Sequence, residues 1–299
     1  MSLAADHVDV APKLDQWSSR RDAPTLIDDR PGMGRVDLRR VAEQTVVTRL
    51  RSGSPLKLLA PRRRHRSAWI IVSNFGGGLV AGDHIDLSLN MGPGAVAYLG
   101  TQASTKVYRG VHGKGARQAM RVTVDHDGLL VVAPDPVTCF KEAVYDQVQR
   151  FDLKGSASLV LLDWMTAGRI ARGERWAMRR YHCRNDIYLD DDHIYADATL
   201  LTPNVGPIDA PFRVGAYNCL ATLVVVGDQF EQIARQFVDG VEAMPLGKRL
   251  PLISSASAFE RGAVLRVAGI STSDVAAFLH DRIGRLANVL GEHPWARKW

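Results

Sequence analysis

Apolar and polar residues alternate with a period of two along much of the chain. Over residues 85–90, Ile or Leu occupies every second position and Asp, Ser or Asn occupies the others, and residues 120–124 repeat the pattern. Such alternation places one set of side chains on each face of an extended segment, so it predicts half-buried β-strands rather than helices. Further strands are expected at 36–38, 45–50, 69–72, 95–99, 129–132, 148–153, 158–164, 175–189, 193–200, 213–226 and 263–268.

Short turn signals separate most of these segments. They are Gly92-Pro93-Gly94, Asp127-Gly128, Gly155-Ser156 and the three aspartates at 190–192. Asp-Gly between alternating apolar residues is a strong hairpin signal. Strands joined by such short turns favour antiparallel meanders over βαβ units. The chain shows no internal repeat at the periods typical of solenoids or propellers.

Helical periodicity begins only near the C-terminus. Asp228 and Glu231 have the spacing of a capping box, and an apolar stripe follows them. A second helix is expected from Ser271, three residues before Asp274, to Gly291. The predicted fold class is therefore mainly β, with two α-helices near the C-terminus.

The first 34 residues contain Pro, Asp and Arg without sustained periodicity. They predict a flexible N-terminal arm, followed by a β-rich domain over residues 35–299. A chain of 299 residues, 46% of them hydrophobic, can bury about three quarters of its unfolded surface, which fits one domain or two closely packed ones.

Three observations favour a cytoplasmic protein that has no membrane partner. No apolar run approaches the ~20 residues that span a bilayer. The N-terminus has no apolar stretch typical of a secretory signal. The three cysteines, Cys139, Cys183 and Cys219, are odd in number and widely spaced, unlike those of a disulfide framework.

A net charge of +6 and a pI of 9.4 raise the question of a nucleic-acid partner. The strongest basic cluster is residues 62–66, RRRHR, between Pro61 and the apolar segment that begins at Trp69. It has no interleaved aromatic residues, so a solvated loop is the favoured interpretation. A docking site for an acidic protein is a second interpretation, and a nucleic-acid-binding module is a third.

A glycine cluster follows the apolar segment 69–72: Gly76, Gly77, Gly78 and Gly82, with Asp83 directly after. The spacing loosely fits a dinucleotide fingerprint, which requires a helix N-terminus after the loop. Here the next segment is a predicted strand. The Lys and Ser or Thr of a Walker loop are absent, and Asp83 at 4 Å from a phosphate would repel it by roughly 4 kcal/mol. The pattern therefore argues against nucleotide binding.

The residues that build metal and nucleophilic sites lack the required spacing. Nine histidines and three cysteines form no CxxC, HxH or HExxH pattern, so no tightly bound metal or cofactor is expected. His182 and Cys183 are strand neighbours that point to opposite faces. His193 beside the aspartates of 190–192 is typical of a hairpin tip. No Gly-x-Ser-x-Gly elbow is present, although a β-rich enzyme with a glycine-lined pocket stays an alternative.

Several segments, in order, resemble the UreD (UreH) family of urease accessory proteins. They are residues 74–83, NFGGGLVAGD; Gly92-Pro93-Gly94; residues 101–109, TQASTKVYR; and residues 162–176, LDWMTAGRIARGERW. The match runs from about Arg35 to the last predicted helix and departs from the family at Phe75, where many bacterial members have proline. The motif residues are Gly76, Gly77, Gly78, Gly82, Thr101, Gln102, Thr105, Lys106, Arg109, Gly168, Arg169 and Gly173.

The resemblance implies a β-rich, roughly helicoidal stack of strands with two helices. It also implies a non-enzymatic chaperone or scaffold for nickel insertion, which binds apo-urease and UreF, with the GTPase UreG docked on UreF. Nickel would be in transit through an internal polar passage that includes Asp83, Ser104 and Glu174. Spaced oxygen donors suit such transit, because a His/Cys cage would trap the ion. A structural ion pair of Glu174 with Arg172 or Arg175 is the alternative.

Overall fold

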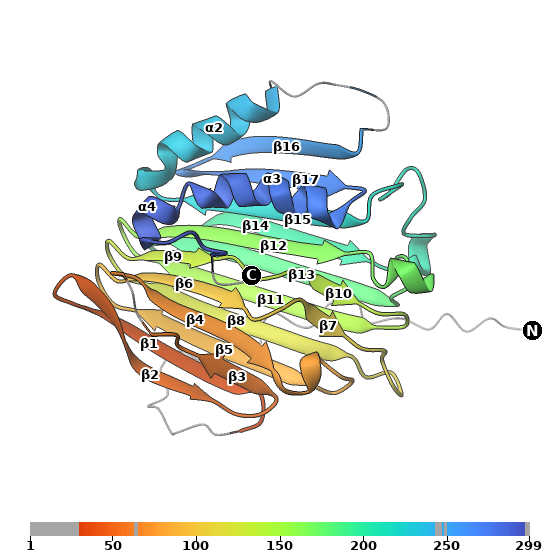
Figure 1. The fold of residues 1–299 in the computed structure, drawn as a ribbon, viewed down its shortest axis with the longest axis horizontal. Coiled ribbons are helices and arrows are strands. Elements are labelled where there is room, and N and C mark those ends of the chain that lie inside the picture. Colours follow the sequence, from red (N-terminus) through yellow and green to blue (C-terminus); the bar gives the residue numbers. More distant parts are fainter. Residues whose placement is uncertain (1–29, 63–64, 243–246, 248–249, 297–299) are drawn as a thin grey trace, which may run out of the picture.

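Two β-sheets lie face to face in the computed structural model, which describes residues 30–62, 65–242, 247 and 250–296 (Figure 1). In this part of the chain, the first sheet has seven strands in the order β14 (Asp192–Leu201), β13 (Arg180–Leu189), β11 (Val144–Leu153), β8 (Ala116–Val124), β5 (His84–Met91), β1 (Met33–Val41) and β2 (Gln44–Ser52). The second sheet follows the order β16 (Leu252–Phe259), β17 (Gly262–Gly269), β15 (Cys219–Val226), β12 (Ser158–Thr166), β9 (Leu129–Val132), β6 (Val96–Thr101), β4 (Ala68–Asn74) and β3 (Leu56–Leu59). Two short strands, β10 (Val137–Cys139) and β7 (Thr105–Val107), extend it beside β12.

The chain winds between the two sheets as a coil. Strands β5, β8, β11 and β13 are parallel neighbours in the first sheet, and β4, β6, β9 and β12 are parallel neighbours in the second. Each passage through one sheet is followed by a passage through the other. The expected helicoidal stack of strands is thereby confirmed, and the architecture resembles a β-solenoid.

The prediction of antiparallel meanders is wrong for the centre of the molecule. The turns at Asp127-Gly128 and Gly155-Ser156 carry the chain from one sheet to the other and close no hairpin. A period of two shows only that one face of a strand is buried, and it does not identify the neighbouring strand. The expected hairpin at 190–192 does form between β13 and β14.

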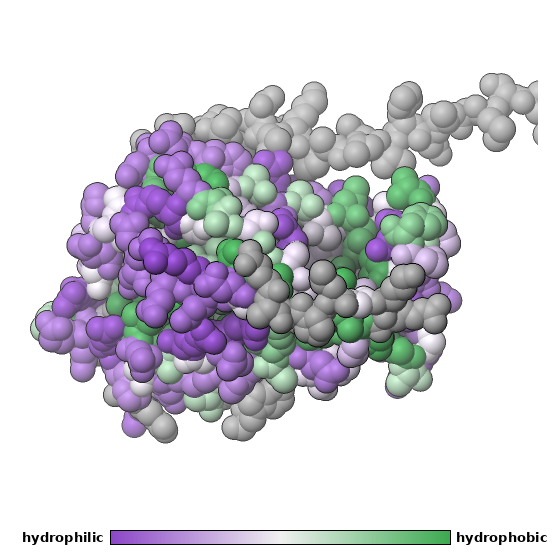
Figure 2. All heavy atoms as spheres, turned by 90° about the horizontal axis from the view of Figure 1, so that it is seen from above, coloured by the Kyte–Doolittle hydropathy of each residue, from purple (hydrophilic) through white to green (hydrophobic). Residues whose placement is uncertain are grey.

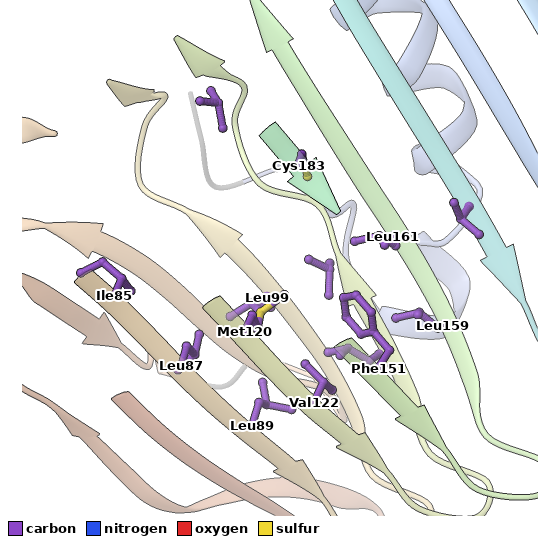
Figure 3. Close-up of a cluster of buried hydrophobic side chains, with 14 of the residues drawn as sticks. Ile85, Leu87, Leu89, Leu99, Met120, Val122, Phe151, Leu159, Leu161 and Cys183 are labelled. Atoms are coloured by element: carbon purple, nitrogen blue, oxygen red, sulfur yellow. The ribbon is translucent and has the colours of Figure 1, made fainter. Parts of the chain in front are cut away.

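A hydrophobic core fills the space between the sheets. Inward side chains of both sheets, among them Leu87 and Phe151 from the first sheet and Leu99 and Leu159 from the second, form one buried cluster (Figure 3). Full burial of one such side chain contributes about 1.5–3 kcal/mol to folding. This core holds the parallel strands in register because a shift of one residue would turn every inward side chain outward.

Within the described residues, three helices cover the outer face of the second sheet: α2 (Glu231–Glu242), α3 (Thr272–Gly284) and the short α4 (Ala287–Leu290). Leu279 of α3 packs in a second apolar cluster with Leu162 of β12 and Leu223 of β15. Burial on both faces explains why these two strands are almost continuously apolar. Trp295, which follows α4, also joins this cluster, with its ring 5.9 Å from that of Trp164 and its indole N–H donating to the Ala133 carbonyl at 3.2 Å.

Several predicted boundaries differ from the structure. The predicted helix 271–291 is divided into α3 and α4, and the predicted strand 213–226 begins only at Cys219. The capping box does not form, because the Asp228 carboxylate binds the Arg261 guanidinium at 3.0 and 3.1 Å. β1 begins at Met33, inside the predicted N-terminal arm, whose residues 1–29 lie outside the described residues.

Candidate functional site

The loops that carry the recognised segments meet at one end of the double sheet. Because β4 is parallel to β6 and β5 is parallel to β8, the connections 75–83 and 102–115 lie at the same end. The parallel pairs of β9 with β12 and β11 with β13 bring 167–179 there as well. We call this end, with the loops 75–83, 102–115, 140–143, 167–179 and 202–218, the loop end; it is on the right in Figure 1.

Backbone hydrogen bonds join these loops in one row. The Leu79 N–H donates to the Lys106 carbonyl at 2.8 Å, and the Tyr108 N–H donates to the Leu79 carbonyl at 2.9 Å. β7 then pairs with β10, and β10 pairs with the end of β12. Gly78 permits this approach, because a Cβ there would lie 2.5 Å from the Lys106 oxygen.

The other recognised glycines of the first loop have a different role. Gly76, Gly77 and Gly82 have φ values of +79°, +72° and +93°, a region that side chains rarely adopt. A Cβ on any of them would meet nothing within 4 Å, so they border open space. This loop therefore bends sharply, and a 3₁₀ turn, η1 (Phe75–Gly77), followed by strand β5, takes the place of the helix that a dinucleotide site needs.

Asp83 stabilises the turn in which it lies. Its carboxylate accepts a hydrogen bond from the Val80 N–H at 2.8 Å, and its carbonyl accepts one from the Arg117 N–H at 2.9 Å. Ser104 is half-buried in the connection between β6 and β7. Gln102, Lys106 and Arg109 are exposed in the same loop region.

Glu174 forms an ion pair with Arg169, three residues before the expected candidate Arg172. The Arg169 guanidinium donates to both carboxylate oxygens, at 2.8 and 2.5 Å, and the Lys141 N–H donates at 3.2 Å. The hydrogen bond from Arg169 lowers the pKa of the Glu174 carboxyl. Arg169 also stacks on the Phe140 ring at 4.1 Å, so the pair ties loop 167–179 to loop 140–143.

Two further glycines fit this arrangement. A Cβ on Gly168 would lie 2.5 Å from the Glu174 carbonyl oxygen and 2.9 Å from that of Cys139, so close packing requires glycine. Gly173 adopts a left-handed conformation, with φ of +73°, at the end of the 3₁₀ turn η2 (Ile170–Arg172).

A row of polar side chains interrupts the core between the sheets. At its centre Asp163 of β12 accepts hydrogen bonds from the Cys183 thiol at 2.8 Å and from the Asn185 amide at 3.0 Å. Gln147 Nε2 donates to Cys183 Sγ at 3.2 Å, and Gln149 Nε2 donates to Asn185 Oδ1 at 2.8 Å. The row therefore runs across the two neighbouring strands β11 and β13 and connects them to the opposite sheet.

Burial changes the proton affinity of the two central groups. Removal from water raises the pKa of the Asp163 carboxyl, although the hydrogen bonds from Cys183 and Asn185 partly oppose this. Burial also raises the pKa of the Cys183 thiol well above its ordinary value, so the thiol keeps its proton and acts as a donor. Burial thus favours the neutral form of the Asp163 carboxyl, and the hydrogen bonds from Cys183 and Asn185 favour its charged form.

Asp163 lines two cavities. The inner cavity, of about 50 Å³, is lined among others by Thr101, Thr105, Gln118, Gln147, Gln149 and Asp163. The edge cavity, of about 290 Å³, lies where the sheets end at β14 and β16, and its lining includes Asp163, Thr199, Thr222, Ile253 and Arg266. Arg266 is exposed and binds Asp197 at 2.9 Å, so the edge cavity opens beside an ion pair.

The structure brings some of the expected residues to this interior and places others elsewhere. Thr101 and Thr105 line the inner cavity, whereas Asp83 and Glu174 are in neither of these two linings. Asp163, Gln147 and Gln149 were not identified from the sequence. A sequence signal existed for Asp163, because the residues two positions away, Leu161 and Met165, are both apolar. Gln147 and Gln149 lie two residues from each other, so the sequence pattern does not mark either as a polar residue in an apolar row.

The chain matches the family model described as UreD urease accessory protein over residues 30–299. The chain belongs to the UreD family of urease accessory proteins. It is 41% identical over 280 residues to the urease accessory protein UreD of Anaeromyxobacter sp. (strain Fw109-5), covering 92% of this chain and 94% of that protein. It is 44% identical over 271 residues to UreD of Sorangium cellulosum (strain So ce56), covering 90% and 85%. The urease accessory protein D of Arabidopsis thaliana is 34% identical over 293 residues, covering 88% of this chain and 99% of the plant protein.

Two features are absent from the described residues of this UreD-family chain. Among these residues, no three His, Cys, Asp or Glu side chains are grouped so that they could hold a metal ion. Over the same part of the chain, none of the helices has the length and apolar character needed to cross a membrane.

Proposed function

We propose that this chain is a non-enzymatic maturation factor that passes nickel to apo-urease along the polar row at Asp163. An accessory role in urease maturation follows from membership of the UreD family. Nickel as the cargo, its route through this chain and the partner proteins go beyond that role and are proposed. The observation that carries it is a half-buried carboxyl group that lines both cavities, within the largely apolar core of the double sheet.

The chemistry of the row suits a divalent cation in transit. Amide, hydroxyl and carboxyl oxygens are donors that Ni²⁺ can use in place of part of its hydration shell, but they are weaker ligands than several imidazoles or thiolates. Because burial raises the pKa of Asp163, an arriving cation has to compete with a proton for this carboxyl. That competition weakens binding and helps the ion to leave.

The partners follow from the family resemblance. Apo-urease would receive the ion, UreF would bind this chain, and the GTPase UreG would dock on UreF and release nickel after GTP hydrolysis. The GTPase chemistry is assigned to UreG because this sequence has no Walker motif. The alternative of an enzyme with a glycine-lined pocket has less support, because Gly76, Gly77 and Gly82 line neither of the two cavities at Asp163.

The test is the substitution Asp163→Asn in the full chain, produced together with the urease proteins. The amide preserves the size of the side chain and removes its charge, so nickel bound per urease active site should fall about tenfold. The control is Asp191→Asn, which changes an 84% exposed carboxylate at the opposite end of the sheets and should leave nickel loading unchanged. Equal nickel content in urease matured with either variant would contradict the proposed route.

The assignment of Asp83, Ser104 and Glu174 to the passage stays a hypothesis. The double substitution Asp83→Ala with Glu174→Ala is expected to lower nickel loading while the complex with the partners persists. The two carboxylates also stabilise their own loops, so the complex has to be measured alongside nickel. Loss of the complex would assign these residues a structural role instead.

A further inference from the structure

Large exposed apolar side chains are concentrated at the loop end. Among the described residues, ten such side chains are exposed, and Val41, at the far end of β1, is the one that lies elsewhere. The strand registers place the other nine: Leu200 lies beside the start of β13, and Ile253 and Ile270 flank the paired ends of β16 and β17. The nine are Phe75, Val80, Val111, Ile170, Leu200, Val205, Phe212, Ile253 and Ile270.

The two most exposed of these side chains lie in the same loop. Phe212 is 82% exposed and Val205 is 72% exposed, both in loop 202–218. Figure 2, seen from above with the loop end on the right, shows hydrophobic groups gathered at that end, whereas the surface on the left is largely hydrophilic. Gathered apolar side chains of this kind mark an interaction site more often than an ordinary solvated surface.

The same end carries an excess of positive charge. The five loops of the loop end contain nine basic residues, Lys106, Arg109, Lys114, Lys141, Arg169, Arg172, Arg175, Arg179 and Arg213. They contain four acidic residues, Asp83, Glu142, Glu174 and Asp209.

Several of these cations are available to a partner. Lys106, Arg109, Lys114 and Arg172 are exposed and have no ion-pair partner within the described part of the chain. Charged residues at the rim of an interface steer association and select a partner of opposite charge.

The loop end also borders the mouth of the edge cavity. Ile253, one of the nine apolar residues, lines that cavity, and Leu200 follows directly after Thr199, which lines it too. A protein that covers the apolar surface would therefore cover the opening that leads to Asp163.

We infer that the loop end docks a protein partner whose contact surface is apolar at its centre and acidic at its rim. If the proposed function holds, the bound partner seals the mouth of the edge cavity, so that a cation passes between the proteins without release to solvent. A second copy of this chain is disfavoured as the occupant, because a two-fold contact would place two basic loop ends against each other.

Binding of purified apo-urease and of purified UreF to the full chain tests this inference. The double substitution Ile170→Ser with Phe212→Ser should weaken binding of one of these probes by at least about tenfold. Val41→Ser is the matched control: it removes a 58% exposed apolar side chain at the other end and should leave both affinities unchanged. Both target side chains are exposed, so circular dichroism spectra should be unaltered.

The contribution of the basic residues of the loop end is tested by the rate of association. Lys114→Glu with Arg172→Glu should slow association with the same probe about tenfold, and the difference from the wild type should shrink between about 50 mM and about 500 mM NaCl. Lys154→Glu, at the opposite end, should change the rate little. Amide hydrogen exchange of loop 202–218 should slow when the probe is added.

The outcomes separate the two proposals. Wild-type chain that binds neither probe contradicts the proposed function. Wild-type binding that survives both loop-end variants contradicts the docking surface and leaves the proposed function standing. Self-association lost in the Ile170/Phe212 variant would identify a second copy as the occupant and overturn the inference, as would DNA binding lost in the Lys114/Arg172 variant without any change in probe binding.

Discussion

Single polar residues within apolar strands determine the chemical character of this fold. Asp163 is the one ionisable side chain on β12, and its partners Cys183 and Asn185 come from β13, the next strand of the chain, which lies in the opposite sheet. A polar residue at a position where the period-two alternation predicts an apolar one can be found in the sequence. Which of them meet depends on the packing of two sheets, and the local pattern contains no information about that.

The pKa of Asp163 leads to a prediction about stability against pH. Because its pKa is raised in the folded state, the native protein binds more protons than the unfolded chain above the ordinary pKa of an aspartate. The free energy of unfolding should therefore decrease as the pH rises from that ordinary value through the raised one. Asp163→Asn should remove this part of the decrease, as measured by urea unfolding at several pH values. Identical pH profiles for the two proteins would contradict it.

Gly78 and Gly76 allow two uses of glycine to be distinguished. Gly78→Ala forces a Cβ against the Lys106 carbonyl oxygen and should cost about 1–3 kcal/mol, with faster hydrogen exchange at Leu79 and Tyr108. Gly76→Ala strains only its own backbone, at about 1–2 kcal/mol, and should leave these two amides protected. Equal exchange in both variants would show that the row of loop hydrogen bonds does not depend on Gly78.

At the scale of elements, the sequence predicts well which segments form strands and helices. It predicts poorly which strands pair with one another. Most strand positions and both apolar helix stripes agree with the structure, because the burial of one face of an element gives its apolar residues a regular spacing in the sequence. The parallel coil was accessible only through the family resemblance. Its equivalent strands begin at His84, Ala116, Val144 and Arg180, at unequal intervals, which explains why no sequence repeat is visible.

Helix α3 is the element whose packing is simplest to test. Leu279 is fully buried between α3 and the second sheet, so Leu279→Ala should lower the free energy of unfolding by about 2–5 kcal/mol. Ser273→Ala, at an exposed position of the same helix, should change it by less than about 0.5 kcal/mol. Thermal unfolding of both variants provides the comparison, and equal midpoints would show that α3 contributes little to the second apolar cluster.

For the whole molecule, the concentration of apolar groups at one end predicts poor solubility of the isolated chain. Val205→Ser with Phe212→Ser should raise the concentration that stays in solution after centrifugation, whereas Val41→Ser should not. A freely soluble wild-type chain, or equal solubility of all three proteins, would contradict this expectation. No sequence pattern predicted this concentration, because its members come from loops, strand ends and turns that only the winding of the chain brings together.

The contact between Trp295 and Trp164 has a consequence for biosynthesis. The outer face of β12 emerges from the ribosome long before the residue that covers it. During that interval a nascent chain presents its central strands uncovered to other polypeptides. A message cut short just before the Trp295 codon therefore yields a protein in which the strands of both described sheets have been synthesised but the Trp295 indole that covers Trp164 is missing.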